Sequence, residues 1–361
     1  MSDLQYWLAL NSIPDIGPVV VRKLLSAFGT PKNIFQMSID ELIQVEGIGK
    51  SRASRIISFN RWNFVEKELQ KAEALNVRLM TFNDPDYPLG LRQIHDAPIV
   101  LYVKGSFEHA DKYGISIVGS RTSTDYGMQV AETMGYRLAS SGLTVVSGMA
   151  RGIDTASHKG ALRAAGRTIA VLGSGIDVPY PYSNRELMNK IESSGAVISE
   201  FPFGTGPNKE NFPKRNRIIS GLSLGVVVIE AALDSGSLIT VAYALDQGRE
   251  IFAVPGNITS RNSRGTNDLI KRGARLVESA EEVIDELRPL LKGILREDKK
   301  SIPDMNEDEK IMHGCLESKP KHIDSITRAI QMTPGKALSV LLSLELKGLV
   351  RQSDGKHFSL H

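Results

Sequence analysis

The spacing of apolar residues changes twice along the chain and divides it into three parts. In residues 1–72, apolar side chains such as Leu4, Leu8 and Leu24 recur at helical intervals between glycines, and no strand pattern occurs. From about 78 to 277, short β-branched runs alternate with helical segments, which is typical of parallel strands joined by helices. Beyond residue 308 the pattern predicts two helices and a hairpin.

Six apolar runs in the middle part are predicted to be strands. Their nearly continuous apolar character is expected of parallel strands that helices cover on both faces. The runs are Ile115–Val118, Leu143–Val146, Thr168–Leu172, Ala196–Ser199, Gly225–Ile229 and Glu250–Val254. The predicted fold class is therefore α/β, an extended Rossmann-like, doubly wound parallel sheet, with a small helical domain before it and a winged-helix domain after it.

The same patterns set the expected domain boundaries. Residues 1–72 are predicted to form a helix-hairpin-helix (SAM-like) domain and residues 78–288 the extended Rossmann-like domain. The polar, charged segment 289–308 is predicted to be a linker, and residues 309–361 a winged helix. Its expected parts are helices Ile323–Ile330 and Pro334–Lys347, strands Leu349–Gln352 and His357–Leu360, and a Ser353-Asp354-Gly355 turn.

Glycine-rich turns follow three of the predicted strands. They are Gly119-Ser120-Arg121, Gly148–Gly152 and Gly173–Asp177, and the carboxyl ends of parallel strands share one rim of the sheet. Backbone amides at a strand-to-helix turn attract phosphate, and an arginine adds a charged contact. The predicted phosphate-binding residues on this rim are Gly119, Ser120, Arg121, Gly148, Arg151 and Gly152. The alternative for each turn is a glycine required only by the tight bend.

The segment from Phe203 to Gly221 adds a cluster of cations. Lys209, Lys214, Arg215 and Arg217 stand against Glu210, which gives a local charge of +3. Phe212 lies among them and Asn216 follows, so one loop is able to meet a phosphate and the face of an unpaired base. Base faces are stacked away in duplex DNA, so an exposed Phe212 favours single strands. The alternative is that Phe212 is a core residue that anchors a solvated basic loop.

Composition narrows the possible functions further. The net charge of the 361 residues is only +3, so affinity for nucleic acid has to come from local clusters of cations. The single cysteine, Cys315, excludes an intrachain disulfide and a cysteine-rich zinc site. The seven histidines lack metal-binding spacing, and no stretch approaches the length of a membrane span. We expect a cytoplasmic protein without metal, cofactor or membrane contact.

Acidic residues near the rim raise the question of catalysis. Glu230 and the Asp234–Ser237 loop follow one strand, and a glutamate beside a glycine loop occurs in Rossmann-type nucleotide hydrolases. The PGGxGTxxE arrangement of those enzymes is absent, and no defensible acid-base pair or Ser/His/Asp order occurs. Non-catalytic binding is therefore favoured, with a nucleotide hydrolase and a duplex-binding regulator as the alternatives.

The two terminal parts have weaker signatures. Gly47-Ile48-Gly49-Lys50, followed by Arg52, resembles a helix-hairpin-helix, which offers backbone amides to a DNA phosphate. Gly47, Gly49, Lys50 and Arg52 are therefore possible auxiliary DNA contacts. An earlier copy has Asp15 where its first glycine belongs, and we expect it to pack on the second copy. The last predicted helix of the chain carries only Lys336 and Lys347 as cations, which favours a protein contact or weak auxiliary DNA contact over groove reading.

Several motifs, taken together, closely resemble the DNA-processing protein A (DprA/Smf) family. They are GSRTSTDYG, SGMARGIDTASHKGAL, GSGIDVPYP, ISEFPFGTGPNKENFPKRNRIISGLS, VIEAALDSGSLITVAYAL and VPGN, in order between about 80 and 277. The resemblance implies single-stranded DNA binding, homodimers formed through the Rossmann domain near 230–255, and loading of RecA recombinase during natural transformation. By matching positions, it places Arg121, Lys209, Phe212, Arg215 and Asn216 in the DNA pocket, with Gly119, Ser120, Gly148 and Gly152 as backbone donors.

Overall fold

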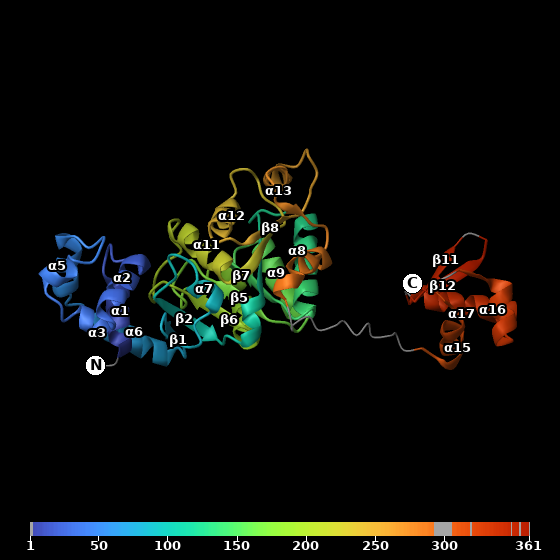
Figure 1. Ribbon diagram of the computed structural model, residues 1–361, viewed down its shortest axis with the longest axis horizontal. Coiled ribbons are helices and arrows are strands. Elements are labelled where there is room, and N and C mark those ends of the chain that lie inside the picture. Colours follow the sequence, from blue (N-terminus) through green and yellow to red (C-terminus); the bar gives the residue numbers. More distant parts are fainter. Residues whose placement is uncertain (1–2, 292–304, 318–319, 348, 354, 361) are drawn as a thin grey trace. The chain divides into compact units, whose positions relative to one another are not determined.

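The computed structural model describes residues 3–291, 305–317, 320–347, 349–353 and 355–360. The chain divides into two compact units, residues 1–295 and 296–361. The first unit contains the amino-terminal helices and the large sheet, and the second is the small carboxyl-terminal domain (Figure 1).

Six short helices form the amino-terminal part. Gly17 lies directly before α2, where Pro18 supplies the fixed φ that suits a first helical position, and Ser38 and Glu41 form a reciprocal cap on α4. Buried Trp7, Leu24 and Ile56 make its core. The helices are α1 (Asp3–Ser12), α2 (Pro18–Phe28), α3 (Pro31–Ile34), α4 (Ile39–Leu42), α5 (Lys50–Ile57) and α6 (Trp62–Ala74).

A nine-stranded sheet follows, in the order β1-β2-β6-β5-β4-β3-β7-β8-β9. All six predicted strands are present, and the strands from β6 to β9 in this order are parallel. The strands are β1 (Arg78–Thr81), β2 (Val100–Gly105), β3 (Gly114–Val118), β4 (Thr144–Ser147), β5 (Thr168–Val171), β6 (Ala196–Ser199), β7 (Ser223–Val228), β8 (Glu250–Ala253) and β9 (Arg275–Leu276).

The predicted parallel sheet is present, and two antiparallel strands extend it at one edge. Strand β2 pairs antiparallel with β6, and β1 pairs antiparallel with β2. Neither these two strands nor β9 was predicted. β9 is two exposed residues long and β1 is half exposed, so neither has the apolar pattern of a buried strand. The direction in which β2 pairs depends on the distant β6, which local sequence does not specify.

Helices cover both faces of the sheet (Figure 1). Successive strand residues point to opposite faces, so Val145 and Val146 belong to different core clusters. One face is covered by α8, α9 and α14, and the other by α7, α11 and α12. The helices of this part are α7 (Leu89–Arg92), α8 (Asp125–Ser140), α9 (Ile153–Arg163), α10 (Arg185–Ser194), α11 (Asn211–Gly221), α12 (Ser237–Asp246), α13 (Arg264–Lys271) and α14 (Ala280–Leu287), with short 3₁₀ turns η1 (His109–Tyr113), η2 (Tyr182–Asn184), η3 (Arg261–Ser263) and η4 (Arg288–Leu290).

Strand order reverses between β3 and β7. From β3 the chain adds β4, β5 and β6 on one side, and then returns to place β7 and β8 on the other. In open α/β sheets the loops at the carboxyl ends of two such strands diverge and leave a crevice. The topology therefore places a ligand site between the loop after Val118 and the loop after Val228.

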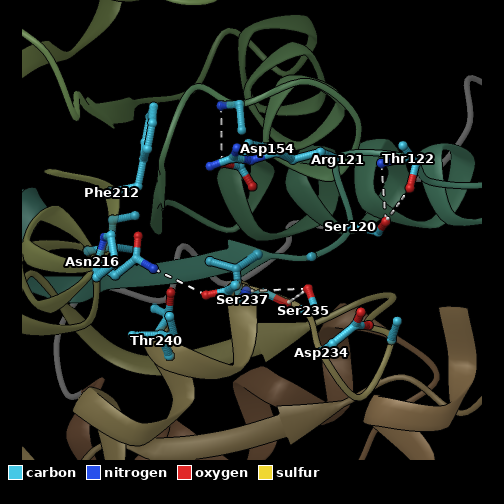
Figure 2. Close-up of a pocket in the computed structure, with 18 of the residues that line it drawn as sticks. Ser120, Arg121, Thr122, Asp154, Phe212, Asn216, Asp234, Ser235, Ser237 and Thr240 are labelled. Atoms are coloured by element: carbon cyan, nitrogen blue, oxygen red, sulfur yellow. Dashed lines mark hydrogen bonds between the residues drawn. The ribbon is translucent and has the colours of Figure 1, made fainter. Parts of the chain in front are cut away.

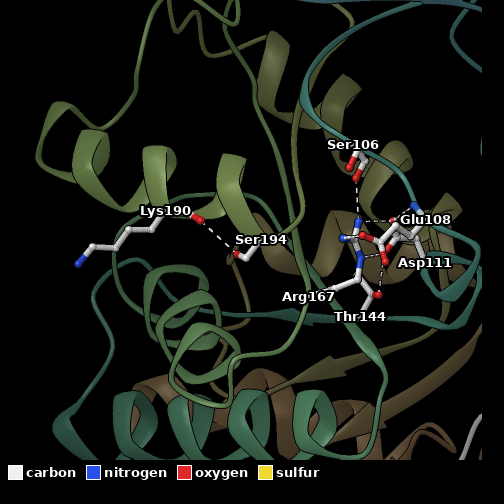
Figure 3. Close-up of polar contacts among 7 residues, drawn as sticks. All are labelled: Ser106, Glu108, Asp111, Thr144, Arg167, Lys190 and Ser194. Atoms are coloured by element: carbon white, nitrogen blue, oxygen red, sulfur yellow. Dashed lines mark hydrogen bonds and ion pairs between the residues drawn. The ribbon is translucent and has the colours of Figure 1, made fainter.

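The opposite end of the sheet is held by a polar cluster around Arg167 (Figure 3). Arg167 donates to Asp111 in η1, to Glu108 and to the carbonyl oxygen of Ser106, and Thr144 at the start of β4 donates to the same Asp111. Asp111 and Thr144 are buried. The cluster therefore holds the amino-terminal ends of β3 and β4 in place.

The second unit has a three-stranded sheet in the order β10-β12-β11 and its own core, which includes Met312, Ile326, Leu341 and Phe358. The predicted helices and hairpin strands are present, while helix α15 and strand β10 were not predicted. Its elements are α15 (Glu307–Cys315), β10 (Lys321–His322), α16 (Ile323–Ile330), α17 (Pro334–Leu346), β11 (Val350–Ser353) and β12 (His357–Leu360).

The expected linker and hairpin turn lie partly outside the described residues. Of the segment 289–308, residues 292–304 are not described, and neither is Asp354 of the turn. At the start of the segment, Leu291 is buried in the core beside α14, and at its end α15 begins at Glu307. Both neighbouring folded parts thus extend into the predicted linker.

Candidate nucleic-acid interface

A cavity of about 700 Å³ opens at the carboxyl ends of the parallel strands, where the strand order reverses. Loops after β3, β4 and β7 and the first turns of α11 and α12 form its walls (Figure 2). Seven of the predicted site residues line it: Gly119, Ser120, Arg121, Lys209, Phe212, Arg215 and Asn216. The structure therefore brings together residues that are up to 97 positions apart in the sequence.

Phe212 stands in the wall of this cavity from the first turn of α11 (Figure 2). It is half-buried rather than exposed, which corrects the expectation from sequence. Its ring centroid is 5.7 Å from that of Tyr180, and the guanidinium carbon of Arg121 lies over the ring at 4.7 Å from the centroid. Arg121 thus covers one face of the aromatic ring.

Gly173 explains how the ring of Phe212 is seated. A Cβ atom at this position would lie 2.7 Å from Cδ1 of Phe212, far inside van der Waals contact. The glycine of the loop after β5 therefore packs beneath the aromatic ring. Gly173 therefore has a packing role, while phosphate binding by its turn stays a prediction.

Arg215 lies beneath the cavity and is 3 % exposed. It donates to the carbonyl oxygens of Gly148 and Val171, at the ends of β4 and β5, and to Oδ1 of Asn216 at 3.2 Å. Burial lowers the pKa of its guanidinium to about 10. It therefore remains charged at neutral pH, which contributes positive potential to the cavity floor.

The basic cluster of the Lys209–Arg217 segment is divided between surface and interior. Lys209 and Lys214 are exposed, whereas Arg217 is 6 % exposed and pairs with Asp96 and Glu200. Together with the buried Arg215, this leaves two of the four cations on the surface. Only Lys209 of these two lines the cavity, so the surface charge here is smaller than the sequence suggested.

The glycines of the loop after β4 are also used for packing. A Cβ at Gly148 would lie 2.5 Å from Nη1 of Arg215, and one at Gly152, where φ is +76°, would clash with the carbonyl oxygen of Ser120. The amide of Ser120 donates to the carbonyl oxygen of Glu230 at 2.7 Å. Gly148, Gly152 and the exposed Arg151 do not line the cavity.

A buried carboxyl group completes the cavity floor. Asp154 is 7 % exposed and accepts the amide hydrogen of Ala150 at 3.1 Å. Burial raises its pKa, while the charges of Arg215 and Arg121 oppose that shift. Burial therefore disfavours the ionised form of Asp154.

Sequence reasoning missed the wall that α12 contributes. Ser235, Ser237 and Thr240 line the cavity (Figure 2), and Asn216 donates to the carbonyl oxygen of Gly236 at 3.3 Å. The signal was present, since the Asp234–Ser237 loop follows a parallel strand just as the three glycine turns do. Its acidic residue instead directs attention to catalysis.

Glu230 does not line the cavity. Its carboxylate accepts the amide of Thr124 at 2.9 Å and the hydroxyl of the same residue at 2.5 Å, while Thr124 caps α8. A carboxylate at a helix amino terminus is stabilised by the free amides and by the helix dipole. These contacts give Glu230 a structural explanation that needs no reaction.

The two amino-terminal hairpins pack together as expected. Arg55 of the second hairpin donates to the carbonyl oxygen of Pro14 at 3.1 Å and pairs with Asp15 of the first. In the second hairpin Gly47, Gly49 and Lys50 are exposed, and Arg52 donates back to the carbonyl oxygen of Gly47. None of these residues lines the cavity after the strands.

Among the described residues, no group of three or more His, Cys, Asp or Glu side chains is arranged to hold a metal ion. Within the same residues, no helix has the length and apolar character needed to cross a membrane.

Comparison with protein families gives three matches along the chain. Residues 78–288 match the DNA recombination-mediator protein A family, residues 8–60 match a SAM-like helix-hairpin-helix tandem, and residues 297–356 match the DprA winged helix domain. The first match covers more than half of the chain.

Sequence and structural similarity to individual proteins supports the same family. Protein Smf of Synechocystis sp. is 34% identical over 396 aligned residues, covering 99% of this chain and 98% of that protein. The crystal structure of DprA from Streptococcus pneumoniae is similar with a TM-score of 0.68 and 35% identity, over 79% of this chain and 98% of that one. DprA from Helicobacter pylori, whose structure concerns its single-stranded DNA binding mode, gives a TM-score of 0.53 and 29% identity, over 59% and 96%.

Proposed function

Because the chain belongs to the DNA recombination-mediator protein A family, we propose that it is a non-catalytic single-stranded DNA-binding protein. In this proposal it protects incoming DNA and loads RecA recombinase during natural transformation. The observation that carries DNA binding is the cavity at the strand-order reversal, where Arg121, Lys209 and Phe212 lie together. The relative from Helicobacter pylori, whose structure concerns its single-stranded DNA binding mode, supports the same ligand.

The strand would enter the cavity with one base against Phe212. A base that stacks on the ring face now covered by Arg121 displaces the guanidinium, which is then free to bind the adjacent phosphate. Lys209 would bind a second phosphate. The cavity walls are formed in part by Gly119, Ser120 and Asn216, and Arg215 adds positive charge. Gly148 and Gly152 act indirectly by keeping the loops packed.

The absence of catalysis is part of the proposal. The best candidate for a hydrolytic carboxylate, Glu230, is hydrogen-bonded to Thr124 at the start of α8. A test is release of free base from a nucleoside monophosphate. If the wild-type chain releases free base and Glu230→Gln does not, the protein is a hydrolase instead.

The proposed partners follow from the family resemblance. RecA and a second copy of the chain, joined through the Rossmann domain, are the expected protein partners in the cytoplasm. Exposed Leu233, Leu245 and Ile258 near the expected dimer segment are compatible with a protein contact there. Equilibrium sedimentation of the purified chain tests the dimer.

Fluorescence anisotropy with a dT oligomer and a matched duplex tests DNA binding. We expect tighter binding to the single strand and an affinity that falls steeply with salt, because bound phosphates release counterions. Phe212→Ala should lose about 1–3 kcal/mol of binding free energy through loss of stacking, and Arg121→Ala should reduce the salt slope by about 1.

Controls separate binding from folding. Phe212→Leu retains an apolar side chain without a π face, so a loss in both variants with unchanged melting indicates stacking. Binding to duplex alone would favour the duplex-regulator alternative. Unfolding of Phe212→Ala would identify Phe212 as a core residue.

A further inference from the structure

A segment with exposed tyrosines begins where the cavity ends. Tyr180 is 44% exposed and lines the cavity, and Tyr182 is 71% exposed just beyond it. The ring of Tyr180 is 5.7 Å from that of Phe212, with an angle of 45° between the planes. The aromatic surface therefore continues from Phe212 out of the cavity towards η2.

Buried contacts hold this segment in place. Asn184, at the end of η2, is 8% exposed, and its Nδ2 donates to the carbonyl oxygen of Met149 at 3.0 Å and to Oγ1 of Thr155 at 2.8 Å. Pro181, between the two tyrosines, is also buried. The tyrosines thus extend from a fixed base, so little entropy is lost when a ligand contacts them.

Cations border the exposed rings. Arg185 begins α10, is exposed, and places Nη1 3.4 Å from the hydroxyl of Tyr182. Arg151 is exposed in the loop after β4, two residues after the Met149 carbonyl that Asn184 contacts. Glu186 is the adjacent acid in the first turn of α10, so the two arginines leave a net positive border.

We propose that residues Tyr180–Arg185, with Arg151, form a second nucleotide subsite for the single strand that leaves the cavity. Tyr182 stacks on an unpaired base, and Arg151 and Arg185 bind phosphates. This subsite rests on the proposed function, since the cavity supplies the preceding nucleotides. Stacking on an exposed ring accepts any base, so the subsite increases affinity and footprint without sequence preference.

The test compares oligomer lengths on the full chain. The probes are the shortest dT oligomer that the wild-type chain binds measurably and one about twice as long. Tyr182→Ala should weaken binding of the long oligomer about fivefold or more and leave the short one unchanged. Tyr182→Phe should restore it, because the ring and not the hydroxyl stacks. Arg185→Ala should flatten the salt dependence only for the long oligomer.

Tyr136→Ala is the matched control. Tyr136 is half-buried on α8 with the guanidinium carbon of Arg163 4.9 Å from its ring centroid, and it does not line the cavity. Its removal should not change binding at either length. Tyr182→Trp adds a direct signal, because a stacked base quenches indole fluorescence only if it contacts that ring.

The outcomes distinguish this subsite from the cavity. If the wild-type chain binds no dT oligomer, or Phe212→Ala binds as tightly as wild type, the proposed function fails. If Phe212→Ala is weakened while Tyr182→Ala binds the long oligomer normally, the subsite alone is refuted. An equal loss at both lengths for Tyr182→Ala also refutes it, because the ring would then act on the cavity.

Discussion

At the scale of single residues, arginines of the same domain have different surroundings. Arg215 is enclosed by the ends of β4 and β5, and Arg217 by Asp96 and Glu200. Arg121, in contrast, is exposed over the ring of Phe212. A buried guanidinium must satisfy its donors internally. The residue type alone therefore does not say which arginine is available to a ligand.

We predict that Arg215→Lys lowers stability and DNA affinity together. A single ammonium cannot reproduce the planar fork that reaches Gly148, Val171 and Asn216. Each lost charged hydrogen bond should reduce the free energy of unfolding by about 1.5–3 kcal/mol. Urea unfolding and anisotropy on the same samples measure both effects.

Lys209→Ala provides the comparison for Arg215. Lys209 is exposed in the cavity wall, so its removal should weaken binding at an unchanged unfolding midpoint. If Arg215→Lys is as stable as wild type but binds more weakly, Arg215 contacts DNA directly.

At the scale of elements, α8 and α9 follow β3 and β4, two of the strands whose loops line the cavity. The helices approach closely, since a Cβ at Gly135 of α8 would meet the backbone of Ser157, and one at Gly160 of α9 would meet that of Glu132. On the sheet side of α9, His158 is fully buried, and its Nδ1 lies 2.7 Å from Oγ1 of Thr168 at the start of β5.

The burial of His158 predicts a pH dependence of stability. Burial, with the nearby charge of Arg215, lowers the pKa of His158 from 6.5 to about 3. Between these values the unfolded chain binds a proton that the folded chain does not, so the stabilisation is complete above pH 6.5 and is lost as pH falls towards 3. Within this window the free energy of unfolding should change by at most about 1.4 kcal/mol per pH unit.

His158→Gln should reduce that slope, whatever its effect on stability at neutral pH. The measurement is urea unfolding of both chains at several pH values within this window. Parallel dependences for His158→Gln and wild type would show that other groups control the response to acid.

At the scale of the whole molecule, the amino-terminal helices and the cavity loops are physically connected. Glu68 of α6 is buried and accepts the hydroxyl of Tyr102 at 2.6 Å and the amide of Phe203 at 3.3 Å. Lys71 of α6 pairs with Asp177 at 2.7 Å. These contacts reach the loops after β5 and β6. The carboxyl-terminal unit, by comparison, has a separate core.

We predict that the two units unfold separately. Leu341 is fully buried in the core of the second unit, so Leu341→Ala should destabilise that unit by about 2–5 kcal/mol. Calorimetry of the full chain should show two transitions, of which only one moves. Binding of the shortest dT oligomer should not change. A joint shift of both transitions would instead indicate that the units unfold cooperatively.

The sequence by itself determined the fold class, six strands and the rim of the sheet at which the cavity opens. This is because apolar periodicity and glycine turns are local, and parallel strands end at a common edge. It also placed Arg121, Lys209 and Phe212 together through the family resemblance.

Only the tertiary structure decided how these residues are used. Burial and pairing depend on residues distant in sequence. Gly173 packs beneath Phe212, and the ends of β4 and β5 enclose Arg215. The hydroxyl of Thr124 donates a hydrogen bond to the carboxylate of Glu230. The antiparallel edge formed by β1 and β2 has the same origin, because β2 pairs with β6, more than 90 residues further along the chain. Long-range packing sets these contacts, and no local pattern encodes them.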